Sequence, residues 1–277
     1  MEHIQNAPAS DLTKRVLSAA LLAPLVLGAV WLGGLAFNVL IGVAIILMAY
    51  EWARVTCGPD WLMDAVLISV TAIAAVLAVH WQIATVNKGM VLFGAGGIIA
   101  AGLALAFWLG RNKGRELRWP LLGIPYIALG SVAMVWLRGL PDLGLALIIW
   151  LLLIVWSMDI GAYFAGRAIG GPKLAPRASP NKTWAGLLGG MLSAGLVGGV
   201  TAAAAGLGQV LALSALSAAI GGWAQLGDIA ESMVKRHFGV KDMSNLIPGH
   251  GGILDRVDGL LFAAPLMIPI ALLIGSK

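Results

Sequence analysis

The chain has 277 residues, of which 60% are hydrophobic and 11% are Asp, Glu, Lys or Arg. Soluble domains carry about 25% charged residues, so this composition excludes an ordinary soluble enzyme. Disorder is excluded as well, because disordered chains are poor in apolar residues. The single cysteine, Cys57, rules out an intramolecular disulfide. In a membrane protein the net charge of +5 points to topology and to anionic headgroups or phosphates rather than to nucleic acid.

Nine apolar stretches follow one another along the chain, and each approaches the roughly 20 residues that a membrane-spanning helix needs. Backbone polar groups in hydrocarbon must be paired within their own segment, which favours helices over a barrel of alternating strands. We therefore expect an all-α, polytopic integral membrane protein with about nine transmembrane helices. The stretches are 16–34, 35–53, 62–80, 89–109, 120–137, 143–165, 184–205, 209–230 and 253–274.

Basic residues distinguish the two sides of this predicted topology. Nine crossings place the termini on opposite sides of the membrane. The 18 Lys and Arg residues then fall on the side of the N-terminus, except Lys88, Arg138 and Lys277. Since cytoplasmic loops carry the excess of Lys and Arg, we expect a cytoplasmic N-terminus and an external C-terminus.

The acidic residues divide the chain into residues 1–155 and residues 156–277. In the first part they lie near predicted span ends or in loops, which favours a scaffold of transmembrane helices. In the second part they lie within or beside apolar segments, where an ionisable group costs about 2.5–3.5 kcal/mol on insertion scales and indicates a functional site. Asp159, one helical turn before Tyr163, is either an ion-pair partner or a ligand. The acids of the second part are Asp159, Asp228, Glu231, Asp255 and Asp258.

The end of the eighth span carries a polar helix face. Gln225, Asp228 and Glu231 are three residues apart, and Ser232 follows Asp228 by four, so all four share one side of a helix. Such hard oxygen ligands suit Mg²⁺, which binds one or two carboxylates together with substrate phosphates. The alternative is a buried polar face that holds helices together.

The glycine-rich loop before the last span is a second polar cluster. Its glycines allow the backbone around His250 to turn sharply and approach an anion. Asp255 and Asp258 share a helix face after it, so a metal and polyphosphate site is expected here. His250 either caps the loop or takes part in the chemistry. Zinc is rejected, because no second His or Cys stands at a ligand spacing.

The basic loop 170–184 is the third polar cluster. Its prolines favour an extended backbone, and a helix starting near Thr183 would present free N–H donors to an anion. Positive-inside bias alone would explain the lysines and arginines but not the compact Ser-Pro-Asn-Lys-Thr run. The loop lacks the GxxxxGK[ST] pattern of a Walker motif.

These clusters together resemble the phosphatidate cytidylyltransferase family, the CDP-diacylglycerol synthases. The matching segments are DIGAYFAG at 159–166, KLAPRASPNKT at 173–183, QLGDIAES at 225–232 and SMVKRHFGVKDMSNLIPGHGGILDRVD at 232–258. The resemblance covers about residues 157–262. The sequence departs from the family at Met158, where Asn is common, and at Ala185, where Glu or Gln is usual.

The resemblance implies that CTP and phosphatidate give CDP-diacylglycerol and pyrophosphate in phospholipid biosynthesis, with Mg²⁺ required and a second cation left open. Residues 1–155 would then supply lipid access as well as a scaffold. Asp228 and Asp255 correspond to the metal-holding acids. The expected catalytic residues are Asp228, Asp255, Lys182, Lys235, Arg256 and Asp258. The expected substrate-binding residues are Ser179, Asn181, Lys182, Thr183, Ser232, Lys235, Arg236, Lys241, His250, Gly251 and Gly252.

Two other functions remain open from the sequence. A CTP-dependent lipid or polyprenol kinase would use similar substrates but transfer the γ-phosphoryl group. An ion or solute transporter would place its acids near the bilayer midplane, whereas these acids accompany basic loops. We expect CTP and bilayer phosphatidate as partners, no nucleic acid, and a multi-pass protein of the cell inner membrane whose active site faces the cytoplasm. A homodimer is left open.

Overall fold

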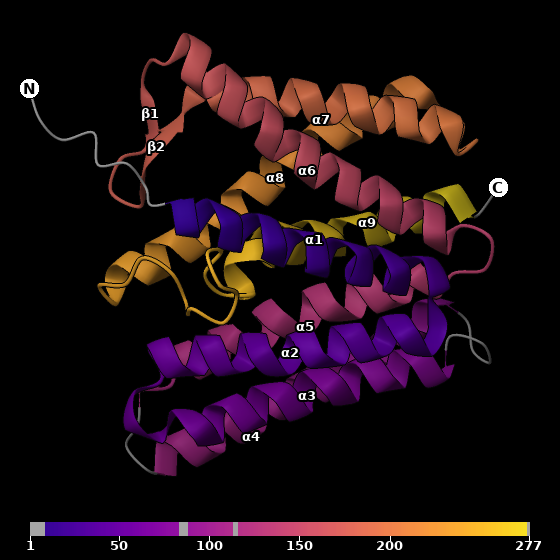
Figure 1. The fold of residues 1–277 in the computed structure, drawn as a ribbon. Helices are drawn as coiled ribbons and strands as arrows, with labels where there is room; N and C mark the ends of the chain where they lie inside the picture. Colours follow the sequence, from indigo (N-terminus) through magenta and orange to yellow (C-terminus); the bar gives the residue numbers. More distant parts are fainter. Residues whose placement is uncertain (1–8, 83–87, 113–115, 276–277) are drawn as a thin grey trace, which may run out of the picture.

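The computed structural model describes residues 9–82, 88–112 and 116–275, and its fold is helical (Figure 1). The short elements are a 3-10 turn, Gly58–Asp60, and the strands β1, Lys173–Ala175, and β2, Ser179–Thr183. The long helices are α1 (Ala9–Leu32), α2 (Gly34–Thr56), α3 (Trp61–Gln82), α4 (Lys88–Asn112), α5 (Arg118–Arg138), α6 (Gly144–Ile169), α7 (Trp184–Ala204), α8 (Val210–His237) and α9 (Leu254–Gly275).

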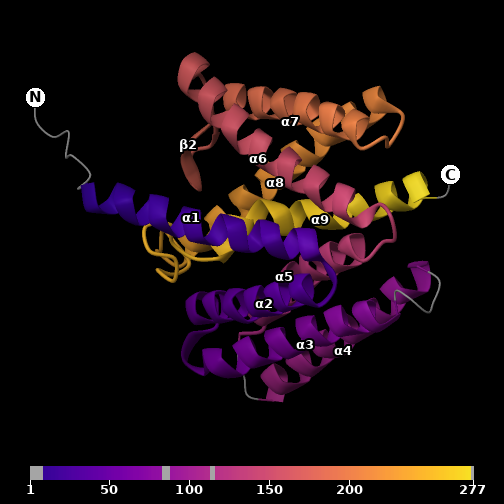
Figure 2. The ribbon, with the colours of Figure 1, turned by 45° about the vertical axis from the view of Figure 1, so that its right-hand side comes forward.

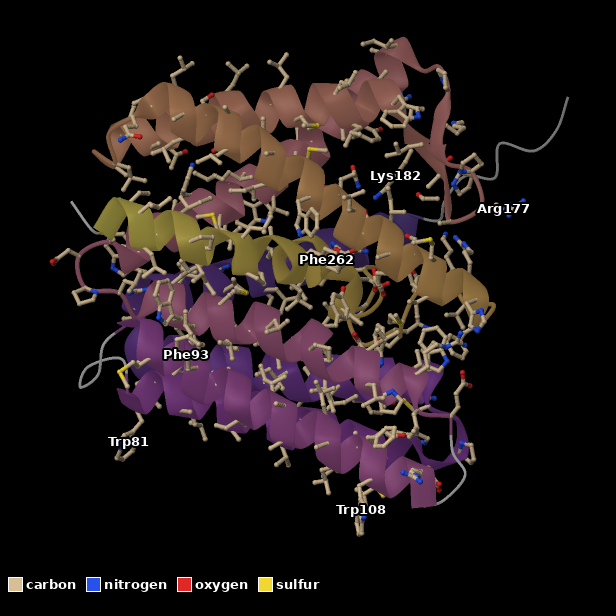
Figure 3. All side chains as sticks on the ribbon, turned by 180° about the vertical axis from the view of Figure 1, so that it is seen from behind. Trp81, Phe93, Trp108, Arg177, Lys182 and Phe262 are labelled. Carbon is tan, nitrogen blue, oxygen red and sulfur yellow. The ribbon has the colours of Figure 1, made fainter. Side chains whose placement is uncertain are left out.

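The helices are those of a membrane protein. Within the described residues, 8 helices are long and apolar enough to cross a bilayer, and α1 contributes the shorter apolar stretch Ala20–Leu32. Large apolar side chains point outward from the bundle, as a lipid-facing surface requires. Trp81 is 82% exposed and Trp108 61% exposed, and both point away from the bundle in Figure 3. The predicted all-α polytopic architecture is confirmed.

Three layers are visible in the bundle (Figures 1 and 2). Helices α2 to α5 form the lower layer and α6 and α7 the upper one, with α1, α8 and α9 between them. The β-hairpin, the α8–α9 loop and the start of α1 lie at one end of the bundle, which we call the hairpin end. The end of α9 lies at the opposite end.

Glycines allow α6, α7 and α8 to pack closely. A Cβ atom on Gly190 of α7 would lie 2.7 Å from the Met158 carbonyl oxygen of α6, and one on Gly221 of α8 would lie 2.8 Å from Cβ of Ala194. Small residues at such positions let membrane helices approach through their backbones. The close packing brings the polar residues of α6 and α8 to one place near the hairpin.

Arg138 joins helices at the opposite end of the bundle. Its Nε donates to the Val30 carbonyl at 2.7 Å, and its Nη2 donates to the Trp31 carbonyl at 2.9 Å. Gly33, with φ +63°, follows these carbonyls and leaves room for the guanidinium. The last residue of α5 therefore binds the break between α1 and α2, far from the hairpin end.

Candidate active site

The basic loop folds as a hairpin that ends in a capped helix. The strands β1 and β2 pair antiparallel, with Lys173 opposite Thr183. Thr183 is the N-cap of α7, and its Oγ1 accepts a hydrogen bond from the Gly186 N–H at 3.0 Å. The predicted helix start near Thr183 is confirmed. Pairing of the strands gives the extended segment a fixed position that prolines alone would not supply.

A cleft of about 590 Å³ lies between the hairpin and helices α6, α7 and α8. Lys182 reaches from the hairpin toward α8 (Figure 3) and forms an ion pair with Asp228. Asp159 of α6 also lines the cleft, as do Asn181 and Thr183. Residues separated by up to 69 positions thus line one cleft. Asp159 lines it together with Lys182, which is compatible with either predicted role of Asp159, ion-pair partner or ligand.

A second lysine joins α8 to α9. Lys235 Nζ lies 3.0 Å from Glu231 Oε2 and 2.7 Å from Asp255 Oδ1. The other oxygen of Asp255 accepts the backbone N–H groups of Met243, at 3.0 Å, and Gly252, at 2.8 Å. The side chains of Lys235 and Asp255 are only 12% and 4% exposed. In this low-dielectric setting the ion pair and its hydrogen bonds hold the carboxylate in one orientation.

The glycine-rich loop turns as its composition predicts. Gly249 and Gly251 have φ angles of 78° and 90°, values that residues with a Cβ rarely adopt. Arg256 donates to the His250 carbonyl oxygen at 2.9 Å through its Nε. The His250 ring lies 2.7 Å, through Nδ1, from the hydroxyl of Ser18 on α1. The histidine thus binds the first helix of the chain, which agrees with its reading as a loop-holding residue.

Glu51 of α2 contacts the glycine-rich loop, a partnership that the sequence did not predict. Its side chain is fully buried and receives three hydrogen bonds: from Ser244 Oγ at 2.6 Å, the Ile253 N–H at 2.9 Å and the Leu254 N–H at 2.8 Å. The carboxylate therefore caps α9 from another helix, where the helix dipole favours negative charge.

The environment of Glu51 also explains Gly252. A Cβ on Gly252 would lie 2.7 Å from Glu51 Oε1, so the loop reaches the carboxylate only with glycine at this position. The sequence analysis placed Glu51 at a span end. The available signal was its place inside the apolar run 35–53, where an uncompensated acid is costly.

Glu231 and Asp258 bring two carboxyl groups into contact between α8 and α9. Two ionised carboxylates repel each other, so this arrangement favours a proton or a cation near the pair. With Asp228 and Asp255 nearby, carboxyl groups outnumber the lysines Lys182 and Lys235 by two. This excess of negative charge fits a divalent cation.

The described residues hold no group of three or more His, Cys, Asp and Glu side chains at metal-binding distance.

The remaining predicted site residues have local contacts. Ser232 donates to Asp228 Oδ1 at 3.3 Å. Arg236 donates to the Ala178 carbonyl at 3.3 Å and thereby holds the hairpin turn against α8. Lys241 is exposed beside the loop, and Ser179 begins β2 without lining the cleft. The structure thus brings the hairpin, the end of α8 and the start of α9 together, as the sequence predicts.

Comparison with known proteins decides the family. The model of the cytidylyltransferase family matches residues 13–273, nearly the whole chain. The chain belongs to the cytidylyltransferase family. The family match extends over α1 to α5, so the helices that carry Glu51 and Ser18 belong to the same unit as the hairpin and the α8–α9 loop.

Individual cytidylyltransferases give the same result. The chain is 39% identical to a phosphatidate cytidylyltransferase of Brucella suis biovar 1 over 278 residues, covering 93% of this chain and 92% of the relative. It is 35% identical to the phosphatidate cytidylyltransferase of Pseudomonas aeruginosa over 265 residues, covering 92% and 94%. That of Bacillus subtilis is 39% identical over 153 residues, covering 55% of this chain and 57% of the relative.

Proposed function

We propose that this protein transfers the cytidylyl group of CTP to phosphatidate, giving CDP-diacylglycerol and pyrophosphate. The observation that carries the proposal is the cleft at the hairpin end, where Lys182 and Asp228 pair across its wall. Full-length similarity to phosphatidate cytidylyltransferases supports it. A transporter would instead place its acids at the midplane of an inverted repeat, whereas these acids accompany the hairpin and a glycine-rich loop.

The reaction requires charge neutralisation and alignment. An oxygen of the phosphatidate phosphate attacks the α-phosphorus of CTP, the new P–O bond forms, and the bond to the β-phosphate oxygen breaks as pyrophosphate leaves. Two polyanions must therefore be held in line. Lys182, which lines the cleft, and Lys235, which lies between α8 and α9, are the lysines we assign to their phosphates. Gln225 lines the cleft, and its Nε2 lacks a hydrogen-bond partner among the described residues, so it is a further donor to substrate.

Mg²⁺ is part of the proposal. Asp228 and Asp255 would hold it, and Glu231 with Asp258 supplies the extra negative charge that a second cation would meet. Bound there, the metal would neutralise charge on the triphosphate and stabilise the leaving pyrophosphate. The protein's own part is to fix Asp255 through the Met243 and Gly252 N–H groups and to fix Asp228 beside Ser232.

The distribution of basic residues supports a cytoplasmic location for the site. We assign the hairpin end to the cytoplasm, since the hairpin, the end of α8 and the start of α9 carry most of the basic residues of the C-terminal half. CTP would then enter the cleft from the cytoplasm, while phosphatidate stays in the inner membrane. The homologous bacterial proteins support the inner-membrane location.

The test is a mixed-micelle assay with purified protein, Mg²⁺, phosphatidate and CTP labelled at the α-phosphate. Label in the lipid phase is expected. Lipid that takes label only from γ-labelled CTP would show a lipid kinase and contradict the proposal. Folded protein that transfers neither label would contradict both enzymatic readings.

A further inference from the structure

A second cavity lies on the other side of α8 from the cleft. Its volume is about 440 Å³, within the range of ligand pockets, and it is bounded by α2, α5, α8 and α9. Trp223, Ala230 and Glu231 contribute to it from α8, whereas Gln225 and Asp228 face the cleft. At 100° per residue these two sets occupy different faces of the helix. We call this cavity the aromatic groove.

The walls of the aromatic groove are nearly all apolar. Its aromatic rings form a row, with centroid distances of 5.5 Å from Trp52 to Tyr126, 5.9 Å from Tyr126 to Phe262 and 6.1 Å from Phe262 to Trp223. Its rim is open to the surface, since Leu129 is 47% exposed and Trp223 is 42% exposed. A groove of this kind can take an alkyl chain directly from the bilayer.

Two polar atoms interrupt the apolar lining. The Tyr126 hydroxyl and Glu231 Oε1 are buried and have no hydrogen-bond partner among the described residues. An unsatisfied hydroxyl in an apolar setting costs about 1–3 kcal/mol, so a ligand that accepts a hydrogen bond from Tyr126 would remove that cost. A bare alkyl chain offers no acceptor, whereas the ester carbonyl of an acyl lipid does.

The groove ends beside residues of the proposed reaction site. Glu231 lines the groove and also binds Lys235, which holds Asp255. From Trp223 to Val234 the groove follows α8 for about 16 Å, at 1.5 Å per residue, and it ends one residue before Lys235. A molecule lying along it with its apolar end at Trp223 would present its polar end to Lys235.

We propose that the aromatic groove binds one acyl chain of the lipid substrate, with the Tyr126 hydroxyl donating to the ester carbonyl of that chain. The inference rests on the proposed function, since it names phosphatidate as the occupant. It places CTP and lipid on different faces of α8, with the carboxylates and lysines between them. The affinity for the lipid should then depend on its acyl-chain length through contacts at Ala230, and on its ester linkage through the hydrogen bond from Tyr126.

The first test fills the groove. Ala230→Phe should raise KM for dioleoyl phosphatidate at least about tenfold, a loss of roughly 1.4 kcal/mol of binding. The KM for water-soluble dihexanoyl phosphatidate, the KM for CTP and kcat should change less than about twofold. The matched control is Ala104→Phe, an exposed position on α4, a helix that does not line the groove, and it should change none of these constants.

The second test removes only the hydroxyl. Tyr126→Phe should raise KM for ester-linked phosphatidate by about fivefold to tenfold, as expected for one lost hydrogen bond. It should leave KM unchanged for the dialkyl ether analogue, which has no carbonyl to accept the bond. A merely structural role of the hydroxyl would affect both lipids equally.

The outcomes separate the two proposals. Wild-type protein that labels neither lipid contradicts the proposed function itself. If it labels both, yet Ala230→Phe affects long and short chains alike, the acyl-chain site is overturned. Loss of a dimer in Ala230→Phe without a chain-length effect would identify the groove as an interface between copies of this chain, which also overturns the inference.

Discussion

Helices α6 to α9 and helices α1 to α5 meet at the same loop but bring different groups to it. The C-terminal helices and the β-hairpin between them carry the charged side chains that line the cleft, notably Lys182 and Asp228. The N-terminal helices reach the loop through Glu51 and Ser18, which bind backbone groups and the His250 ring. The C-terminal half carries the charged side chains of the candidate site, and the N-terminal half holds the α8–α9 loop in position.

Glu51 and Asp228 differ in what their oxygens bind. Both oxygens of Glu51 accept hydrogen bonds from the loop and from the first residue of α9, so Glu51 acts on position. Among the described residues, Asp228 contacts the side chains of Lys182 and Ser232, is 34% exposed and borders the cleft. A carboxylate in that setting can exchange its lysine for a cation, whereas Glu51 cannot without releasing α9.

The largest effect is expected from removing a carboxylate of the C-terminal half. Asp228→Asn or Asp255→Asn should lower kcat by about 10³-fold, or roughly 4 kcal/mol, because the substituted amide binds cations poorly. The labelled-CTP assay measures the loss, and a thermal melt in detergent checks that the protein is folded. Full activity in either variant would contradict the metal role.

Lys235 should come next in effect. Lys235→Met should lower kcat by about 10²-fold, a loss typical of removing one charged group from a reacting centre. It should also lower stability, because Glu231 and Asp255 would be left buried without their counter-charge. Lys241→Met is the matched control, since Lys241 is exposed; an equal loss there would indicate a general charge effect.

Glu51 tests the role of the N-terminal half directly. Glu51→Gln should lower kcat about tenfold and stability by about 2 kcal/mol, since an amide can replace one acceptor oxygen but not both. Its Mg²⁺ titration should move to higher concentration, because Asp255 is less well fixed. Glu116→Gln, at an exposed ion pair with Arg118, should leave all three measurements unchanged.

The smallest catalytic effect is expected at Arg138. Arg138→Gln should leave kcat within about twofold, since the residue lies at the opposite end of the bundle, but it should lower stability by about 1–2 kcal/mol through its lost hydrogen bonds. Parallel assay and melting curves check this. A strong loss of activity without unfolding would contradict the assignment of the active site to the hairpin end.

The fold class was predictable because a lipid bilayer restricts the backbone conformations that a spanning segment can adopt. Apolar runs of span length must be helices, so nine long segments and their approximate limits followed from hydropathy alone. The pairing of β1 with β2 was not predicted, because Ser179–Thr183 is short and holds a proline. The layering of the helices also required the structure, since it depends on backbone approaches such as Gly190 to Met158.

The candidate site was predictable where spacing defines a shared helix face. Asp228 and Ser232, four residues apart, do lie in hydrogen-bond contact. The partnership of Glu51 with Leu254 spans 203 positions, and no local pattern reports such a contact. The acid that joins the two halves could therefore be seen only once the helices were packed.

The bond between Glu51 and the start of α9 also bears on biosynthesis. Glu51 is synthesised 203 residues before Leu254, which at 5–20 residues per second is about 10–40 s. During that interval the Glu51 carboxylate of α2 lacks the backbone N–H groups that later donate hydrogen bonds to it. A nascent chain that stops short of α9 therefore has a buried acid without the Ile253 and Leu254 N–H donors, so α2 reaches its final environment only when the last helix is in place.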